Sequence, residues 1–182
     1  MAQKDTLITA EQRKRAIERM IRVNQAGEFG AKRIYAGQLA VMGDRTPAAR
    51  SIAHMAEQEE RHLNAFDKMM AERGVRPTAL HPIWNAAGFA LGAVSALVGP
   101  EAAMACTVAV ETEIDRHYGE QLAEIGDSDP ELAAMIADFQ ADELEHKATA
   151  LEQGAERAFG YPVMSALVRM GCRTAIAVSK HI

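Results

Sequence analysis

Two Glu-x-x-His pairs, in the segments EQEERH and ADELEH, constrain the fold of this chain more than any other feature. Glu59 and His62 form the first pair, and Glu143 and His146 form the second. Residues three positions apart lie on the same side of an α-helix, so each pair can point into the interior of a helical bundle. One such pair alone is common on a solvated helix surface. The functional interpretation therefore depends on whether the two pairs belong to an internal repeat.

The chain does contain such a repeat. The segment 24–40 aligns with the segment 107–123 without a gap, and identical residues recur along the aligned stretch, including Gln-Leu-Ala at the end of both segments. Glu28 then aligns with Glu111, and one further position of shift aligns the two Glu-x-x-His pairs. Each half therefore has a helix with one Glu, followed at nearly the same distance by a Glu-x-x-His pair.

Composition and turn signals predict an all-α fold. Only 5% of the 182 residues are aromatic, while Ala and Met are frequent, which favours helices over a β-sandwich. Short turn clusters rich in Gly, Pro and Asp separate the long segments, as in an antiparallel bundle. Thr9 and Asp129 are expected helix N-caps. The expected helices span residues 9–42, 48–73, 79–98, 100–125, 130–158 and 162–179.

Six residues of the repeat are candidate metal ligands. One Glu from each of two helices and a Glu-x-x-His pair from each of two more form the ligand set of ferritin-like carboxylate proteins. Four carboxylates are costly to bury without counter-charge, and two divalent cations would neutralise them. Carboxylate and imidazole ligands with open positions favour iron, with manganese as the second choice. The predicted ligands are Glu28, Glu59, His62, Glu111, Glu143 and His146.

A polar residue directly precedes the Glu of each Glu-x-x-His pair. A metal-bound histidine usually donates its second ring N–H to a carboxylate or a carbonyl oxygen. Asp142 is therefore expected to orient a ligand histidine across the bundle, and Gln58 holds the equivalent place in the first half. A solvent-exposed position for Asp142 is the alternative.

Two tyrosines repeat with the same offset from a candidate ligand. Tyr35 follows Glu28 by seven positions, and Tyr118 follows Glu111 by the same number. This offset corresponds to about two helical turns, so each tyrosine lies on the helical face that carries the ligand. We predict that Tyr118 is catalytic, with its neighbour His117 as the second candidate; a filling role in the core is the alternative for both.

Two helices have more apolar surface than a bundle requires. The helix at 79–98 contains an uninterrupted apolar run from Ala86 to Gly99, which is too short to span a bilayer. Its small residues, such as Gly92, are expected to pack poorly against neighbouring helices. The helix at 162–179 places Arg169 and Arg173 on an apolar background, which is typical of a helix lying in a membrane interface. We predict peripheral membrane association through both helices, with a fully soluble bundle as the alternative.

Charge and the N-terminal sequence limit the remaining choices. The net charge of −5 argues against nucleic acid as the main partner. The stretch MAQKDTLITAEQRKRAIERM has no apolar region of a secretory signal, and its acidic residues disfavour a transit peptide. The expectation is an intact bacterial protein.

Long segments of the chain carry a family resemblance: RVNQAGEFGAKRIYAGQLAVMG, QEERHL, RPTALHPIWNAAGFALGAVSALVG, EAAMACTVAVETEIDRHYGEQL and DELEHKATALEQGA. In these segments the chain resembles the demethoxyubiquinone hydroxylases, also called 5-demethoxyubiquinol monooxygenases or 3-demethoxyubiquinol 3-hydroxylases. The resemblance covers nearly the whole chain from Arg22 onward, and the family's metal residues fall on the six candidate ligands. It implies a ferritin-like four-helix bundle with two additional helices, as a single di-iron domain over residues 1–182 with repeat halves at about 9–73 and 100–158.

The resemblance implies a specific reaction. A member of this family is a monooxygenase of ubiquinone biosynthesis that hydroxylates one ring carbon of a polyprenylated methoxy-methyl-benzoquinol, converting demethoxyubiquinol to demethylubiquinol. Two iron ions, O₂ and an external reductant associated with NADH are implied, although the chain has no GxGxxG motif of a Rossmann site. Also implied are a lipid-binding accessory protein as partner and a peripheral location on the cytoplasmic side of a bacterial membrane. A homo-oligomer is left open.

Three alternative classes compete with this interpretation. A ferritin-like iron store needs a soluble closed shell, which the apolar helices disfavour. A rubrerythrin-type peroxidase normally adds a rubredoxin module with CxxC pairs, and this sequence has no CxxC. A metal-free structural bundle would leave four buried carboxylates without counter-charge.

Overall fold

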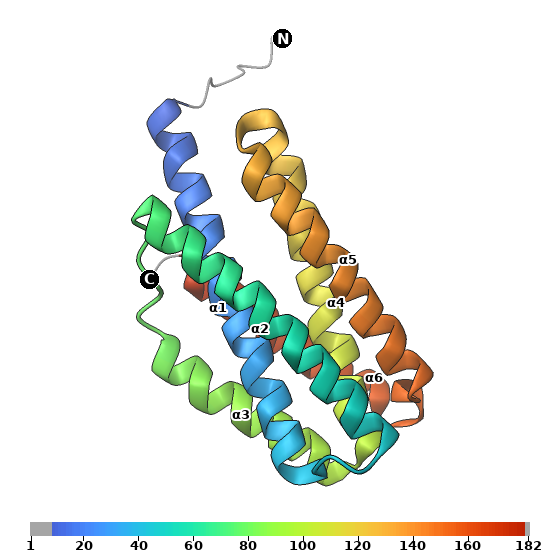
Figure 1. The fold of residues 1–182 in the computed structure, drawn as a ribbon. Helices are drawn as coiled ribbons and strands as arrows, with labels where there is room; N and C mark the ends of the chain where they lie inside the picture. Colours follow the sequence, from blue (N-terminus) through green and yellow to red (C-terminus); the bar gives the residue numbers. More distant parts are fainter. Residues whose placement is uncertain (1–8, 181–182) are drawn as a thin grey trace.

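The computed structural model describes residues 9–180, all of whose regular structure is helical (Figure 1). The all-α prediction is therefore confirmed. Residues 1–8 and 181–182 lie outside the described part. The expectation that the N-terminal stretch is neither a secretory signal nor a transit peptide falls partly on these residues. In chain order the elements are α1 (Ala10–Met42), α2 (Pro47–Arg73), α3 (His81–Val98), α4 (Pro100–Ile125), the 3₁₀ turn η1 (Gly126–Ser128), α5 (Pro130–Glu152), the 3₁₀ turn η2 (Ala155–Arg157) and α6 (Tyr161–Ser179).

Local sequence signals set the helix starts. The Thr9 hydroxyl accepts the backbone N–H of Gln12 at 3.2 Å, and the Gln12 side chain accepts the N–H of Thr9 at 2.8 Å. This reciprocal pair is a capping box. Asp129 accepts the N–H of Leu132 at 3.1 Å ahead of a proline at the first helical position. Both predicted N-caps are confirmed.

The predicted helix at 130–158 is too long, because α5 ends at Glu152. Gly154 follows with φ +90°, a left-handed conformation that glycine adopts without steric cost. Its N–H donates to the Leu151 carbonyl oxygen at 2.9 Å and closes the last turn. The chain then buries Ala155 in the core before α6 begins. Most residues of this stretch are good helix formers, so local propensity does not distinguish such a buried turn from a continuing helix.

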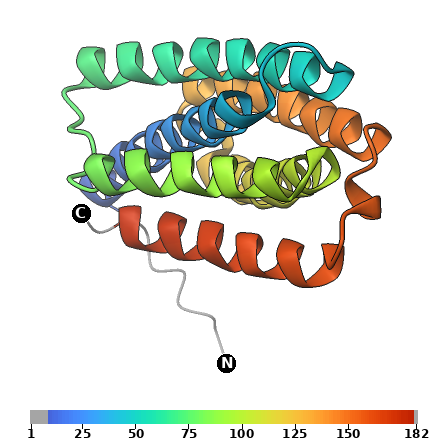
Figure 2. The same ribbon diagram turned by 90° about the horizontal axis from the view of Figure 1, so that it is seen from below.

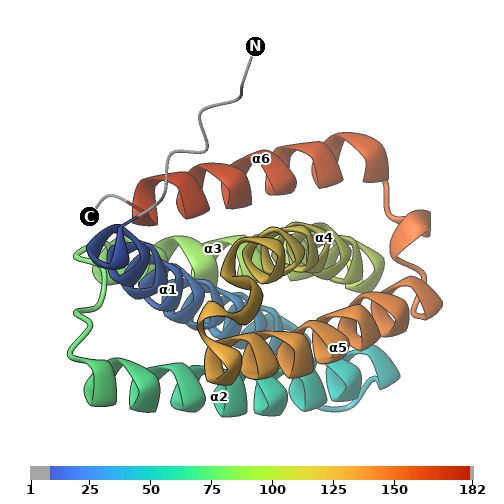
Figure 3. The ribbon, with the colours of Figure 1, turned by 90° about the horizontal axis from the view of Figure 1, so that it is seen from above.

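The four helices of the repeat, α1, α2, α4 and α5, run lengthwise beside one another (Figure 1). The α3 helix packs along α1, and α6 packs along α4. Figure 2 shows α2 and α6 at opposite edges of the molecule, and Figure 3 shows the same order from the other end. The two additional helices thus cover the α1/α4 side of the bundle, and α2 and α5 form the opposite side.

Glycines make the contact between α1 and α3 close. A Cβ built on Gly92 would lie 1.9 Å from the backbone oxygen of Ile34, and one built on Gly37 would lie 2.1 Å from that of Phe89. The expectation that the small residues of α3 pack poorly is therefore wrong. Their lack of side chains lets two helix backbones touch.

Gly92→Val is expected to lower the free energy of unfolding by about 1–3 kcal/mol, because the new side chain would force α3 away from α1. Gly171→Ala on α6 is a matched control, since a Cβ there meets nothing within 4 Å and alanine has the higher helix propensity. Urea unfolding followed by circular dichroism measures both variants. Wild-type stability of Gly92→Val would contradict the close helix contact.

The outer faces of α3 and α6 carry large exposed apolar side chains. We call this set the apolar surface. No helix within residues 9–180 is both long enough and apolar enough to span a bilayer. The apolar surface consists of Ile83, Phe89, Val94, Leu97 and Val98 on α3, and Val163, Leu167 and Met170 on α6.

The two arginines of α6 bind a carboxylate of α4, although their side chains are 39% and 54% exposed. Arg169 Nε donates to Oε1 of buried Glu113 on α4 at 2.6 Å, and Arg173 Nε donates to Oε2 at 2.9 Å. Although burial opposes it, hydrogen bonds from Arg173, Arg169 and Arg116 lower the pKa of Glu113 to about 2, so the carboxylate stays charged. Both arginines thus tie α6 to α4 and do not form a separate basic stripe, while the membrane-interface position of α6 stays a prediction.

Candidate metal centre

The six predicted ligands come from the four repeat helices and lie in the bundle interior. The α1 helix supplies Glu28 and α4 supplies Glu111. The α2 and α5 helices each supply a Glu-x-x-His pair. All six side chains are at most 1% exposed. Apolar clusters around Met55 and Met104 on one side and Phe66 and Ile136 on the other close the interior along the bundle axis.

The donor atoms of these residues form two overlapping groups. Within each group, one atom from every residue lies within 4.8 Å of the others. Glu59 and Glu143 belong to both groups, so the geometry provides two adjacent cation positions with two shared carboxylates. The first group is Glu28, Glu59, His62 and Glu143, and the second is Glu59, Glu111, Glu143 and His146.

Both histidine rings turn Nδ1 toward this centre. His62 Nδ1 lies 3.3 Å from Glu28 Oε2 and 3.2 Å from Glu143 Oε1. His146 Nδ1 lies 3.1 Å from Glu143 Oε2 and 3.5 Å from Glu59 Oε1. The i, i+3 spacing within α2 and within α5 thus places carboxylate and imidazole donors together, as the helical period requires.

The protein alone leaves this centre electrostatically unsatisfied. Burial and the charge of Glu143 raise the pKa of Glu59 well above its usual value, and the same two causes raise that of Glu111. Buried polar atoms normally have a hydrogen-bond partner, whereas these converging atoms have none. Two divalent cations would supply the missing partners and balance four carboxylates, so the donor set fits the implied metals. The unpartnered atoms are Glu28 Oε2, Glu59 Oε1 and Oε2, His62 Nδ1, Glu111 Oε2 and Glu143 Oε1.

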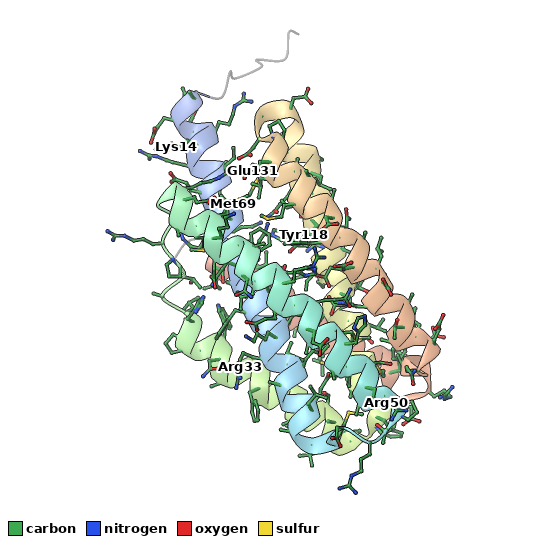
Figure 4. All side chains as sticks on the ribbon, viewed as in Figure 1. Lys14, Arg33, Arg50, Met69, Tyr118 and Glu131 are labelled. Atoms are coloured by element: carbon green, nitrogen blue, oxygen red, sulfur yellow. The ribbon has the colours of Figure 1, made fainter. Side chains whose placement is uncertain are left out.

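Two buried tyrosines contact the centre across the repeat. The Tyr35 hydroxyl donates to Glu111 Oε1 at 2.5 Å, and the Tyr118 hydroxyl donates to Glu28 Oε1. Figure 4 labels Tyr118, which lies in the interior between the repeat helices. Burial and the charge of Glu28 raise the pKa of Tyr118 well above its usual value, so its hydroxyl keeps the proton that it donates. Each tyrosine therefore contacts the Glu of the opposite half, which an offset within one helix cannot predict.

The outer ring nitrogens also have partners from the opposite half. His62 Nε2 lies 2.9 Å from Asp142 Oδ2, and His146 Nε2 lies 3.1 Å from Gln58 Oε1. The predicted contact of Asp142 with a histidine across the bundle is thus present. Such contacts fix the tautomer and the orientation of a ligand ring.

Comparison with known proteins decides the family. A family model described as ubiquinone biosynthesis protein COQ7 matches residues 15–179. The chain belongs to the COQ7 family. This confirms the family resemblance found in the sequence, and it agrees with the ferritin-like bundle.

Several curated relatives of this COQ7-family chain are close in sequence. The 3-demethoxyubiquinol 3-hydroxylase of Rhodospirillum rubrum is 49% identical over 166 residues, which cover 91% of this chain and 78% of that protein. The mitochondrial NADPH-dependent 3-demethoxyubiquinone 3-hydroxylase of Homo sapiens is 48% identical over 171 residues, with 92% and 78% covered. Its namesake in Dictyostelium discoideum is 51% identical over 173 residues, with 93% and 79% covered.

His117, the second candidate catalytic residue, lies apart from the six residues of this COQ7-family site. Its Nε2 is 2.9 Å from the side-chain nitrogen of Gln121, which in turn donates to Asn24 at 2.8 Å. Burial and the charge of Lys180 lower the pKa of His117 to about 4, so the imidazole is neutral at pH 7. The ring borders a small cavity of about 90 Å³ beside Arg19.

Arg61 also contributes to the site, although the sequence patterns do not indicate it. This residue precedes His62 and donates to both Asp138, at 2.8 Å, and Asp142 from across the bundle. It therefore holds the carboxylate that contacts the outer nitrogen of His62. The only signal in the sequence is its place inside the first Glu-x-x-His pair, and the partner of a surface arginine cannot be read from that position.

Proposed function

We propose that this COQ7-family protein hydroxylates a polyprenylated methoxy-methyl-benzoquinol, converting demethoxyubiquinol to demethylubiquinol in ubiquinone biosynthesis. The observation that carries the proposal is the pair of overlapping Glu/His groups that share Glu59 and Glu143, buried in a chain of this family. The names of the relatives describe the same hydroxylation. The whole chain is proposed to act as one domain, in which both halves of the repeat build one site.

The reaction balances with O₂ and one external reductant. One oxygen atom replaces a ring hydrogen as a hydroxyl group, and the other leaves as water after it takes up two electrons and two protons. Two ferrous ions held by the six residues would supply the electrons that activate O₂. A reduced nicotinamide dinucleotide is the proposed source of electrons; the human relative is named NADPH-dependent.

The protein's own groups hold this chemistry in place. Glu59 and Glu143 would help to hold both cations, because each belongs to both donor groups. The hydroxyls of Tyr35 and Tyr118 hold one carboxylate oxygen each of Glu111 and Glu28. The remaining carboxylate oxygens stay free to face the metals. The apolar clusters close the site at both ends along the bundle axis.

Tyr118→Phe is expected to slow single-turnover hydroxylation by about tenfold or more, because it removes one hydrogen bond at the site while keeping the ring. We propose that Tyr118 acts on the reaction and leaves the iron content unchanged. Tyr35→Phe, which removes the equivalent hydrogen bond to Glu111 in the other half of the repeat, is the next substitution to test. Equal rates for Tyr118→Phe and wild type would make Tyr118 a core residue, and a loss of iron would assign it to positioning Glu28.

The apolar surface supports a proposal about location. A substrate with a polyprenyl tail resides in a bilayer. The exposed side chains of the apolar surface can bind at the headgroup region of that bilayer. We propose peripheral binding to the cytoplasmic side of a bacterial membrane. A lipid-binding accessory protein of the same pathway is the proposed protein partner, and self-association is an additional proposal that the same surface allows.

A turnover assay tests the proposed function. Protein loaded anaerobically with ferrous iron receives demethoxyubiquinol with a short tail, reduced nicotinamide dinucleotide and air, and chromatography with mass spectrometry identifies the quinone product. Hydroxylated product in amounts above the iron added is expected. Uptake and oxidation of iron without a hydroxylated product would instead favour the ferritin-like alternative.

A further inference from the structure

The internal repeat is symmetric at the six candidate ligands and at both tyrosines, but the residues behind the two histidines differ. Behind His62 stands a carboxylate, Asp142, whereas behind His146 stands a neutral amide, Gln58. The residue before the Glu of each Glu-x-x-His pair is therefore the point at which the two halves of the site diverge chemically.

The outer side of His62 is closed and charged. Asp142 Oδ2 accepts hydrogen bonds from both the His62 ring and Arg61, and Arg61 also pairs with Asp138 at 2.8 Å. The Arg61 guanidinium lies 5.1 Å above the Phe139 ring, which stacks on His62 with 4.0 Å between the centroids. A carboxylate partner makes a ligand imidazole more basic, and its loss typically costs about 10–100-fold in metal affinity.

The outer side of His146 is open, and its direct partner there is the neutral amide of Gln58. His146 and Gln58 border a solvent-connected cavity of about 320 Å³ between α2 and α5, whose wall also includes Thr149, exposed His54 and two charged residues, Arg50 and Glu145. A water molecule occupies about 30 Å³ of liquid, so the cavity has room for several. Water and a hydrated cation can thus reach the neighbourhood of His146, whereas Phe139 and Arg61 block the equivalent approach to His62.

We infer that the two metal positions of the proposed centre are unequal, and that the position held by His146 exchanges its divalent cation through the cavity while the position held by His62 retains its cation. The inference rests on the proposed function, because it requires two bound cations. Asp142 and Gln58 are the positioning residues that create the difference. The retained cation keeps the shared carboxylates in place while the second position refills.

Chelator-induced release of ferrous iron measures the inequality directly. Wild-type protein is loaded anaerobically with two equivalents of Fe²⁺ and mixed with a coloured ferrous chelator. Two release phases of equal amplitude are expected, with rates that differ by about tenfold or more. Asp142→Asn should accelerate the slow phase, and Gln58→Asp should slow the fast one. Asp142→Glu, which keeps the carboxylate, should restore most of the slow phase.

Three further variants separate the effect of the ligand from that of the access route. Thr149→Phe should narrow the cavity and slow the fast phase without changing the slow one. Ala148→Phe, one residue earlier on an exposed part of α5, is the matched control and should leave both phases unchanged. His146→Ala should remove the fast phase and keep the slow one, and circular dichroism checks that each variant keeps its helices.

The possible outcomes distinguish this inference from the proposed function. Release of both ions in one phase from wild type would overturn the inference, and so would equal effects of Asp142→Asn on the two phases. A fast phase unaffected by Thr149→Phe would exclude the cavity as the route. A protein that binds no ferrous iron at all would contradict the proposed function instead.

Discussion

Glu143→Ala is expected to remove both metal ions, one of the two largest effects expected at this site, because Glu143, like Glu59, belongs to both donor groups. Glu143 belongs to both donor groups and lies close to both His62 Nδ1 and His146 Nδ1. Its loss therefore opens both cation positions at once. Metal analysis of dialysed protein should find about two iron ions in wild type and almost none in the variant.

Two comparisons make this result specific. Glu152→Ala removes an exposed carboxylate from the end of the same helix and should leave the iron content unchanged. Glu111→Ala removes a residue of one group only and should affect one position more than the other. Circular dichroism of the apo proteins checks that Glu143→Ala keeps the helices of wild type. An unchanged iron content in Glu143→Ala would exclude this centre.

The second large effect is expected at the apolar surface. The triple variant Val94→Ser, Leu97→Ser and Leu167→Ser should lose binding to phospholipid vesicles by at least about a hundredfold. The three side chains are 58%, 72% and 58% exposed. Burying an aliphatic side chain contributes about 1.5–3 kcal/mol, and about 1.4 kcal/mol corresponds to a tenfold change in affinity. Leu91 is only partly exposed and packs on the core, so its replacement would also reduce stability.

Vesicle sedimentation measures this binding. Leu144→Ser and Leu151→Ser replace exposed leucines of α5, on the opposite side of the bundle, and are the matched controls. They should sediment as wild type does. A wild-type protein that does not bind vesicles, or a triple variant that binds as wild type does, would contradict the proposed membrane location.

The repeat made much of the site predictable from sequence. Helical periodicity places Glu59 beside His62 wherever the helix lies, and the duplication identified which Glu residues accompany the two pairs. The same reasoning could not identify the partners across the bundle. That the Tyr118 hydroxyl reaches Glu28, and not the Glu111 of its own helix, follows from how α1 and α4 are placed beside each other.

The incorrect predictions share a physical cause. The spacing between Arg169 and Arg173 serves equally well for a surface stripe and for a pair of hydrogen bonds to one buried carboxylate. The partner, Glu113, lies on a different helix and far away in the sequence. Similarly, a glycine such as Gly92 is compatible both with a loosely packed helix and with two helix backbones in contact. Tertiary packing decides such cases, and local sequence patterns do not contain it.

A single-turnover reaction under ¹⁸O₂ tests the central claim most directly. Protein loaded with ferrous iron is mixed anaerobically with short-tailed demethoxyubiquinol and then exposed to ¹⁸O₂, without any other reductant. Mass spectrometry should find one ¹⁸O atom in the new ring hydroxyl of the product, formed in an amount that depends on the iron loaded and is absent in Glu143→Ala. Iron that is oxidised to the ferric state while the quinol gains no ¹⁸O would contradict the hydroxylase function.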